Sequence, residues 1–147
     1  MVYVSSAAGQ IAQPSNSAYG ASKAAANQMI QQFSNDNAGT GNVFQTFHPG
    51  VIYTGFSGAV VPKEAFDWED GKHSSHRVQT GRSKTRVPAL TIVLANLPGN
   101  YAVWLASEEA QFLGGKFTWA QWDVDELLTL KEKIAANPFY LATSVVV

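Results

Sequence analysis

Four polar side chains near the start of the chain have the types and spacing of a proton-transfer site. Ser5 and Ser6 follow a short apolar run, and Tyr19 and Lys23 lie four residues apart in an alanine-rich segment. This spacing brings two side chains to the same face of a helix. An ammonium group one helical turn away stabilises the phenolate form of a tyrosine, so that a phenol can exchange protons near neutral pH. We therefore expect Tyr19 and Lys23 to act together in acid–base chemistry.

The elements around these residues predict two parallel strands joined by a helix. Residues 1–6 are β-branched and aromatic before they become polar, which favours a short buried strand. Residues 18–35 lack proline and carry alanine and apolar residues at helical spacing, which predicts a helix. Residues 43–47 predict a second strand, and the His-Pro-Gly sequence at 48–50 ends it. Ligands bind at the carboxyl ends of parallel strands. Ser6 and the Pro-Gly turn should therefore face one cleft.

The second half of the chain predicts further elements of the same kind. Residues 101–112 have helical periodicity, and residues 116–122 alternate as in a third strand. Asp123 has the position of a helix cap, and the helix after it has apolar positions up to Ile134. The chain is expected to be an α/β protein with about three parallel strands and three flanking helices.

The middle of the chain has a different composition. Residues 52–62 are irregular and predict a flap over the cleft, and residues 63–70 predict a turn or two of helix in which Trp68 is the aromatic residue expected to touch a substrate. Residues 71–96 hold half of the basic residues and have no hydrophobic periodicity in their basic part. We expect this segment to be an exposed insert.

Bulk composition excludes several classes of function. The chain has 147 residues, 46% of them hydrophobic and 14% charged, which fits one globular domain. Its formal charge of −1 gives no electrostatic reason to bind nucleic acid or an anionic membrane. No apolar run is long enough to span a membrane, and the absence of cysteine excludes disulfides and thiolate metal sites. We expect a cytoplasmic protein without a metal site.

Three features taken together resemble the active-site half of the short-chain dehydrogenase/reductase family. Ser6 lies thirteen residues before Tyr19, Tyr19 and Lys23 form a Tyr-x-x-x-Lys motif, and Pro-Gly follows the next strand. The stretch at 97–107 and the one at 115–120 further resemble fungal members. The resemblance covers nearly all of the chain except the insert and the extreme tail. It implies a partial Rossmann-like sheet.

The resemblance also implies roles for individual residues. Tyr19 would be the general acid or base, Lys23 would favour its phenolate form and hold the nicotinamide ribose, and Ser6 would hydrogen-bond the substrate oxygen. The nicotinamide end and the phosphates of NAD or NADP would be positioned by Pro49, Gly50, Ile52 and Thr54. Reduction of a ketone, or oxidation of a secondary alcohol, of a small-molecule substrate is the implied reaction.

One part of the family pattern is missing from the sequence. The Gly-rich turn that binds the cofactor phosphates opens a helix after the first strand of the family's sheet. None of the twelve glycines here forms such a turn, because Gly39 and Gly41 close a helix instead of opening one. We expect residues 1–147 to be a single truncated domain of this family.

Two other functions compete with the redox reaction. The site could catalyse an isomerisation, dehydration or cyclisation without hydride transfer, or the chain could be a non-catalytic binding module. We expect a homo-oligomer that associates through the helix at 18–35, because apolar faces of this helix would otherwise be uncovered.

Overall fold

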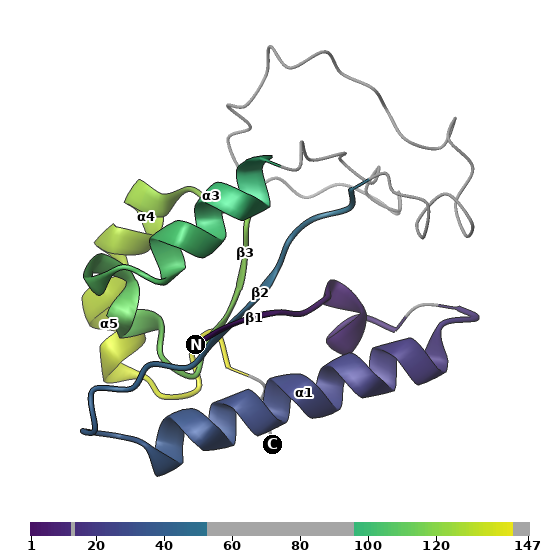
Figure 1. Ribbon diagram of the computed structural model, residues 1–147, viewed down its shortest axis with the longest axis horizontal. Coiled ribbons are helices and arrows are strands. Elements are labelled where there is room, and N and C mark those ends of the chain that lie inside the picture. The colour runs from purple at the N-terminus through teal and green to yellow at the C-terminus, as the bar shows by residue number, and fades with distance from the viewer. Residues whose placement is uncertain (13, 53–95, 143–147) are drawn as a thin grey trace.

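The computed structural model describes residues 1–12, 14–52 and 96–142. Within these ranges, β1 (Val2–Val4), β2 (Gln45–His48) and β3 (Phe117–Trp119) form one parallel sheet in the order β1-β2-β3. Figure 1 shows the strands between the long helix α1 (Ser17–Asp36) and the helices of the C-terminal half. The expected α/β fold, with parallel strands and flanking helices, is confirmed.

Helix α1 forms where alanine is dense and proline absent, and its ends differ by one residue from the predicted 18–35. Gly39 and Gly41, both with φ near 80°, follow its end as predicted. The helix buries Asn27 and Ile30 but leaves Met29 51% and Phe33 40% exposed. Self-association through this helix stays a prediction.

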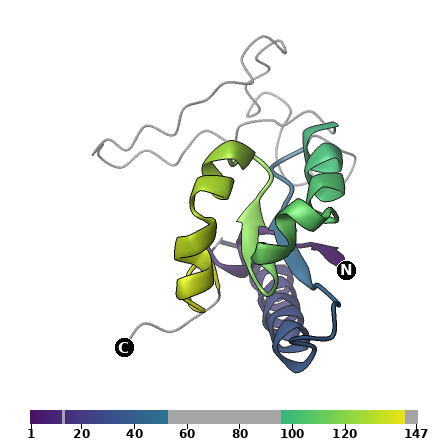
Figure 2. The same ribbon diagram turned by 90° about the vertical axis from the view of Figure 1, so that its left-hand side faces the viewer.

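The two faces of the sheet carry different layers. Tyr3 and Phe47 belong to opposite faces, because Tyr3 pairs with Thr46, the residue before Phe47. Tyr3 contacts α1 through Lys23, whereas the ring of Phe47 lies 5.5 Å from that of Tyr101 in α3 (Asn96–Leu105). Figure 2 shows α1 nearly along its axis, below the strands. In the same view α3 lies to the right, and α4 (Val124–Thr129) and α5 (Lys131–Ala136) lie to the left.

The main core lies on the face of Phe47. It includes side chains from α3, from the 3₁₀ segment η3 (Glu108–Leu113), and from α4 (Val124–Thr129) and α5 (Lys131–Ala136). Leu105, Leu113 and Ile134 are each at most 2% exposed. Gln45 of β2 buries its side-chain amide in this layer. Its Nε2 donates to the Ala110 carbonyl over 2.7 Å, so the buried amide has a hydrogen-bond partner.

Several predicted bounds differ from the observed ones. The helix expected at 101–112 divides into α3 and η3, and α3 begins earlier because Pro98 is tolerated in its first turn. The helix expected after Asp123 divides at Leu130, where α4 ends and α5 begins. The predicted cap is confirmed, since Asp123 Oδ1 accepts from the backbone N–H of Asp125 at 2.8 Å and of Glu126 at 3.2 Å.

Strand β1 is more exposed than expected. The sequence predicted a buried strand, but Val4 is 50% exposed and Val2 and Tyr3 are half-buried. Among the described residues β1 has one neighbour, β2, and so lies at the edge of the described sheet. An apolar, β-branched run does not by itself distinguish an edge strand from a central one.

Some expectations fall outside the described residues. These are the flap beyond residue 52, the turn or two of helix at 63–70 with Trp68, and the exposed insert, of which only Asn96 is described, as the first residue of α3. None of the helices in the described ranges is long and apolar enough to cross a membrane.

Candidate functional site

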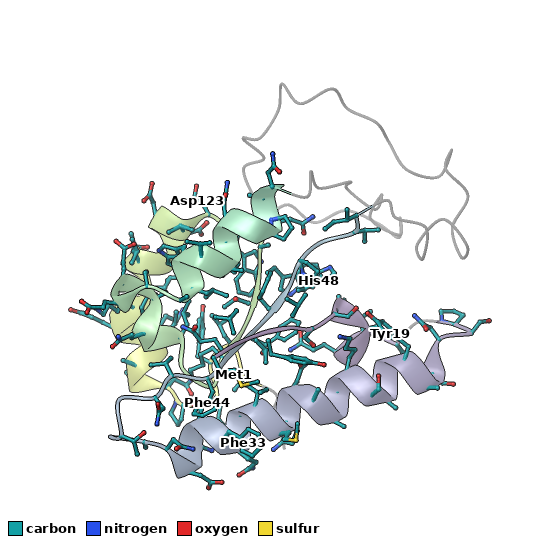
Figure 3. The ribbon with its side chains drawn as sticks, viewed as in Figure 1. Met1, Tyr19, Phe33, Phe44, His48 and Asp123 are labelled. Atoms are coloured by element: carbon teal, nitrogen blue, oxygen red, sulfur yellow. The ribbon has the colours of Figure 1, made fainter. Side chains whose placement is uncertain are left out.

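Tyr19 and Lys23 meet on one face of α1, as their spacing predicted. The Lys23 Nζ lies 5.7 Å from the centroid of the Tyr19 ring, and both side chains are half-buried. Figure 3 shows Tyr19 on the part of α1 nearest to the 3₁₀ turn η1 (Ala7–Gly9). At this distance the ammonium interacts with the π-electrons of the ring and with any negative charge on the phenol.

Ser6 is held at the start of η1. Its backbone is extended, and its Oγ accepts a hydrogen bond of 3.2 Å from the backbone N–H of Ala8. A hydroxyl has one donor and two acceptor sites, so this bond leaves the Ser6 proton free to be donated. The hydrogen bond from Ala8 therefore orients the Ser6 side chain and leaves the Ser6 O–H as a donor for a substrate oxygen.

Two glycines bring the turn of Ser6 against the helix of Tyr19. A Cβ atom on Gly20 would lie 2.8 Å from the Ala8 carbonyl oxygen, and one on Gly9 would lie 2.9 Å from the backbone nitrogen of Ala24. Both distances are too short for a side chain, so η1 and α1 touch through their backbones. This contact is what fixes Ser6 relative to Tyr19.

The carboxyl ends of β1 and β2 bring the Pro49-Gly50 turn close to Ser6. The Ser5 backbone N–H donates to the Phe47 carbonyl over 2.8 Å, which extends the pairing of the two strands to their carboxyl ends. Ser6 therefore follows β1 at the edge of the sheet where Pro49 and the buried Gly50 follow β2. Gly50 has φ of 88°, a conformation that suits glycine and turns the chain sharply.

Ile52 and Thr54 were also predicted to bind the cofactor, and the structure describes only Ile52. Ile52 is half-buried and follows the Pro-Gly turn, and Thr54 lies outside the described residues. The shared cleft stays a prediction. Two depressions in the described ranges lie elsewhere, around Asn42 and Gln111.

His48 packs at the end of β2. It is 7% exposed and meets Trp119 edge-on, with ring centroids 4.6 Å apart. Burial lowers the pKa of His48 to about 4, so the imidazole is neutral at physiological pH. Its Nδ1 has no hydrogen-bond partner within the part of the chain that the structure describes.

Sequence reasoning missed the side chains of Tyr3 and Asn27, which hold Lys23 and its helix in place. Lys23 Nζ donates to the Val4 carbonyl over 3.1 Å and to the hydroxyl of Tyr3 over 3.5 Å. One turn further along α1, the 4% exposed Asn27 accepts a bond of 2.5 Å from the Ser5 hydroxyl. Asn27 continues the i, i+4 series of Tyr19 and Lys23, a signal that could have identified it.

Comparisons with known proteins match this chain to one family. Residues 1–65 match the family described as short chain dehydrogenase. The chain is 39% identical over 149 residues to a short chain dehydrogenase/reductase of Claviceps purpurea. It is 34% identical over 147 residues to short chain dehydrogenase/reductase AacuD of Aspergillus aculeatus, and 35% identical over 151 residues to nsrO, of the same description, of Aspergillus novofumigatus.

The matches differ in how much of each protein they cover. They include 99%, 100% and 100% of this chain but 42%, 43% and 44% of the relatives. The chain thus spans less than half the length of the curated relatives that it matches.

Proposed function

Because this chain belongs to the short-chain dehydrogenase/reductase family, we propose that it carries the proton-transfer site of an NAD(P)-dependent oxidoreductase. Its reaction interconverts a ketone and a secondary alcohol of a small molecule. The observation that carries the proposal is the ammonium of Lys23, 5.7 Å from the Tyr19 ring, on a helix in backbone contact with the turn that Ser6 caps.

The three side chains divide the work of carbonyl reduction. Ser6 donates its hydroxyl proton in a hydrogen bond to the substrate carbonyl oxygen, and Tyr19 transfers its phenolic proton to the same oxygen. Lys23 stabilises the phenolate that remains. When bound, the reduced nicotinamide supplies the hydride for the carbonyl carbon, so the ketone gains two electrons and the cofactor loses them. In the reverse direction the Tyr19 phenolate removes the alcohol proton.

The described residues fit the nicotinamide-ribose end of such a cofactor. An ammonium has three donors, and Lys23 uses two of them, on the Val4 carbonyl and the Tyr3 hydroxyl. The third is available for a ribose hydroxyl. Pro49, Gly50 and Ile52 would border the nicotinamide at the adjacent strand end, since ligands lie at the carboxyl ends of parallel strands.

Cofactor binding and turnover, measured on the same samples, test the proposal. NADH or NADPH is titrated into the full chain by fluorescence, and a panel of ketones is assayed with the wild-type chain and with Tyr19→Phe. We expect binding by both proteins and turnover by the wild type alone. Tyr140→Phe is a matched control, because Lys133 Nζ lies 4.9 Å from the Tyr140 ring, outside the site.

Other results would overturn the redox proposal. No binding at millimolar cofactor removes it for this chain. If Tyr19 is then still needed for a cofactor-independent conversion, the site is an isomerase, dehydratase or cyclase. If neither Tyr19→Phe nor Lys23→Ala changes any measured activity, a non-catalytic binding module is the better account.

A further inference from the structure

Lys23 lies between two tyrosines, of which the proposed mechanism uses one. Its Nζ is 5.1 Å from the centroid of the Tyr3 ring and 5.7 Å from that of Tyr19. Tyr3 comes from β1 and Tyr19 from α1, so the ammonium bridges the strand and the helix. The Tyr3 ring is the nearer of the two, and its hydroxyl is also within 3.5 Å of the ammonium.

No carboxylate holds Lys23 in the part of the chain that the structure describes. The polar atoms that its Nζ contacts are the Tyr3 hydroxyl and the Val4 carbonyl, which are adjacent along β1. Tyr3 and Tyr19 are the titratable side chains seen against it. Neutral acceptors, not an opposite charge, therefore fix where the positive charge lies.

We propose that Tyr3 is a positioning residue that keeps the Lys23 ammonium beside Tyr19. The inference rests on the proposed role of Tyr19 in proton transfer. A lysine side chain has four rotatable bonds, and an unrestrained ammonium would spend much of its time in solvent. The Tyr3 hydroxyl accepts from the ammonium while the Tyr3 ring attracts it, and both limit this freedom. Tyr3 thus keeps the positive charge where it stabilises the Tyr19 phenolate.

Two substitutions separate the contributions of the hydroxyl and the ring. Tyr3→Phe keeps the ring and removes the acceptor, whereas Tyr3→Leu removes both. We expect the midpoint of Tyr19 ionisation to move to higher pH in Tyr3→Phe, and further in Tyr3→Leu, because the ammonium then spends less time beside the phenolate. In alcohol oxidation the acid limb of the pH–rate profile should move in the same direction, because the base form of Tyr19 becomes scarcer.

The first measurement requires neither cofactor nor substrate. Phenolate absorbance near 295 nm is titrated in the full chain, and the Tyr19 contribution is the difference between each protein and the same protein carrying Tyr19→Phe. Tyr140→Phe serves as a control for the loss of a hydroxyl from a tyrosine whose ring lies close to another lysine. Circular dichroism at each pH shows whether the variants remain folded, and Tyr3→Phe preserves the packing if Tyr3→Leu does not.

The outcomes distinguish this inference from the proposed function. A Tyr19 midpoint that is unchanged or lower in folded Tyr3→Phe overturns the positioning role, even if the wild type reduces ketones with NADH or NADPH. A higher midpoint supports the role even if no nicotinamide-dependent turnover is found. A change that Tyr140→Phe reproduces would be a general effect of losing a tyrosine hydroxyl, and would also overturn it.

Discussion

Replacing Gly20 by alanine tests how the turn of Ser6 is held against the helix of Tyr19. In a helix interior, alanine is more favourable than glycine by about 1 kcal/mol. At Gly20, however, the new Cβ would lie 2.8 Å from the Ala8 carbonyl oxygen. That oxygen belongs to the backbone of η1 and cannot rotate away, so the turn must move. Overpacking of this kind costs about 1–3 kcal/mol.

The two effects oppose each other, and the clash should dominate. We expect Gly20→Ala to lower the free energy of unfolding by about 1 kcal/mol, measured by urea denaturation. Displacing η1 also displaces Ser6 from Tyr19, and a misplacement of about 1 Å can reduce turnover about 10²-fold. The fall in kcat should therefore be larger than the modest loss of stability alone would produce.

Gly99→Ala is the matched control for this experiment. Gly99 lies in α3, and a Cβ there would meet no atom within 4 Å. This variant should be as stable as the wild type or more stable, by up to about 1 kcal/mol, with normal turnover. If Gly20→Ala proves as stable and as active as Gly99→Ala, the tight contact between η1 and α1 does not position the site.

Three further predictions concern the buried groups and the surface of α1. Burial lowers the pKa of His48 from 6.5 to about 4, so its contribution to the free energy of unfolding should be complete above pH 6.5 and fall by about 3 kcal/mol as the pH drops to 4. Urea denaturation at several pH values should show a flatter pH dependence of stability for His48→Gln, and an equally steep one would refute the assignment. Asn27→Ala leaves the buried Ser5 hydroxyl without its acceptor and should lower the free energy of unfolding by about 1–3 kcal/mol in the same assay. The Ser5→Ala/Asn27→Ala double variant should recover part of this loss, whereas strictly additive losses would contradict the pairing. Met29→Lys should weaken self-association in analytical ultracentrifugation, because Met29 is 51% exposed on α1, and an unchanged sedimentation coefficient would place the interface elsewhere.

The parts of the fold that local sequence determines could be predicted from it. Alanine density and the absence of proline gave α1 almost to the residue, and the Asp123 cap depends on a side chain and two backbone groups within three residues. Tyr19 and Lys23 are brought together by helical geometry alone, which explains why their spacing was informative.

The parts that depend on packing between distant segments could not be predicted. Which apolar side chains of α1 are buried depends on how the helix is rotated against the sheet, so Ile30 is buried while Met29 is exposed. The role of Tyr3 depends on its face of β1, and its polar partner is twenty residues away. The contact of Gly20 with Ala8 likewise exists only after η1 has folded against the helix.

The turnover of Tyr19→Phe tests the central claim most directly. Initial rates of ketone reduction are measured with saturating NADH or NADPH for the wild type, Tyr19→Phe and Tyr140→Phe. The account predicts a loss of about 10²- to 10⁴-fold for Tyr19→Phe, the usual contribution of a positioned general acid, with cofactor binding unchanged and Tyr140→Phe fully active. Wild-type turnover by Tyr19→Phe would contradict it, because the phenolic proton would then have no part in the reaction.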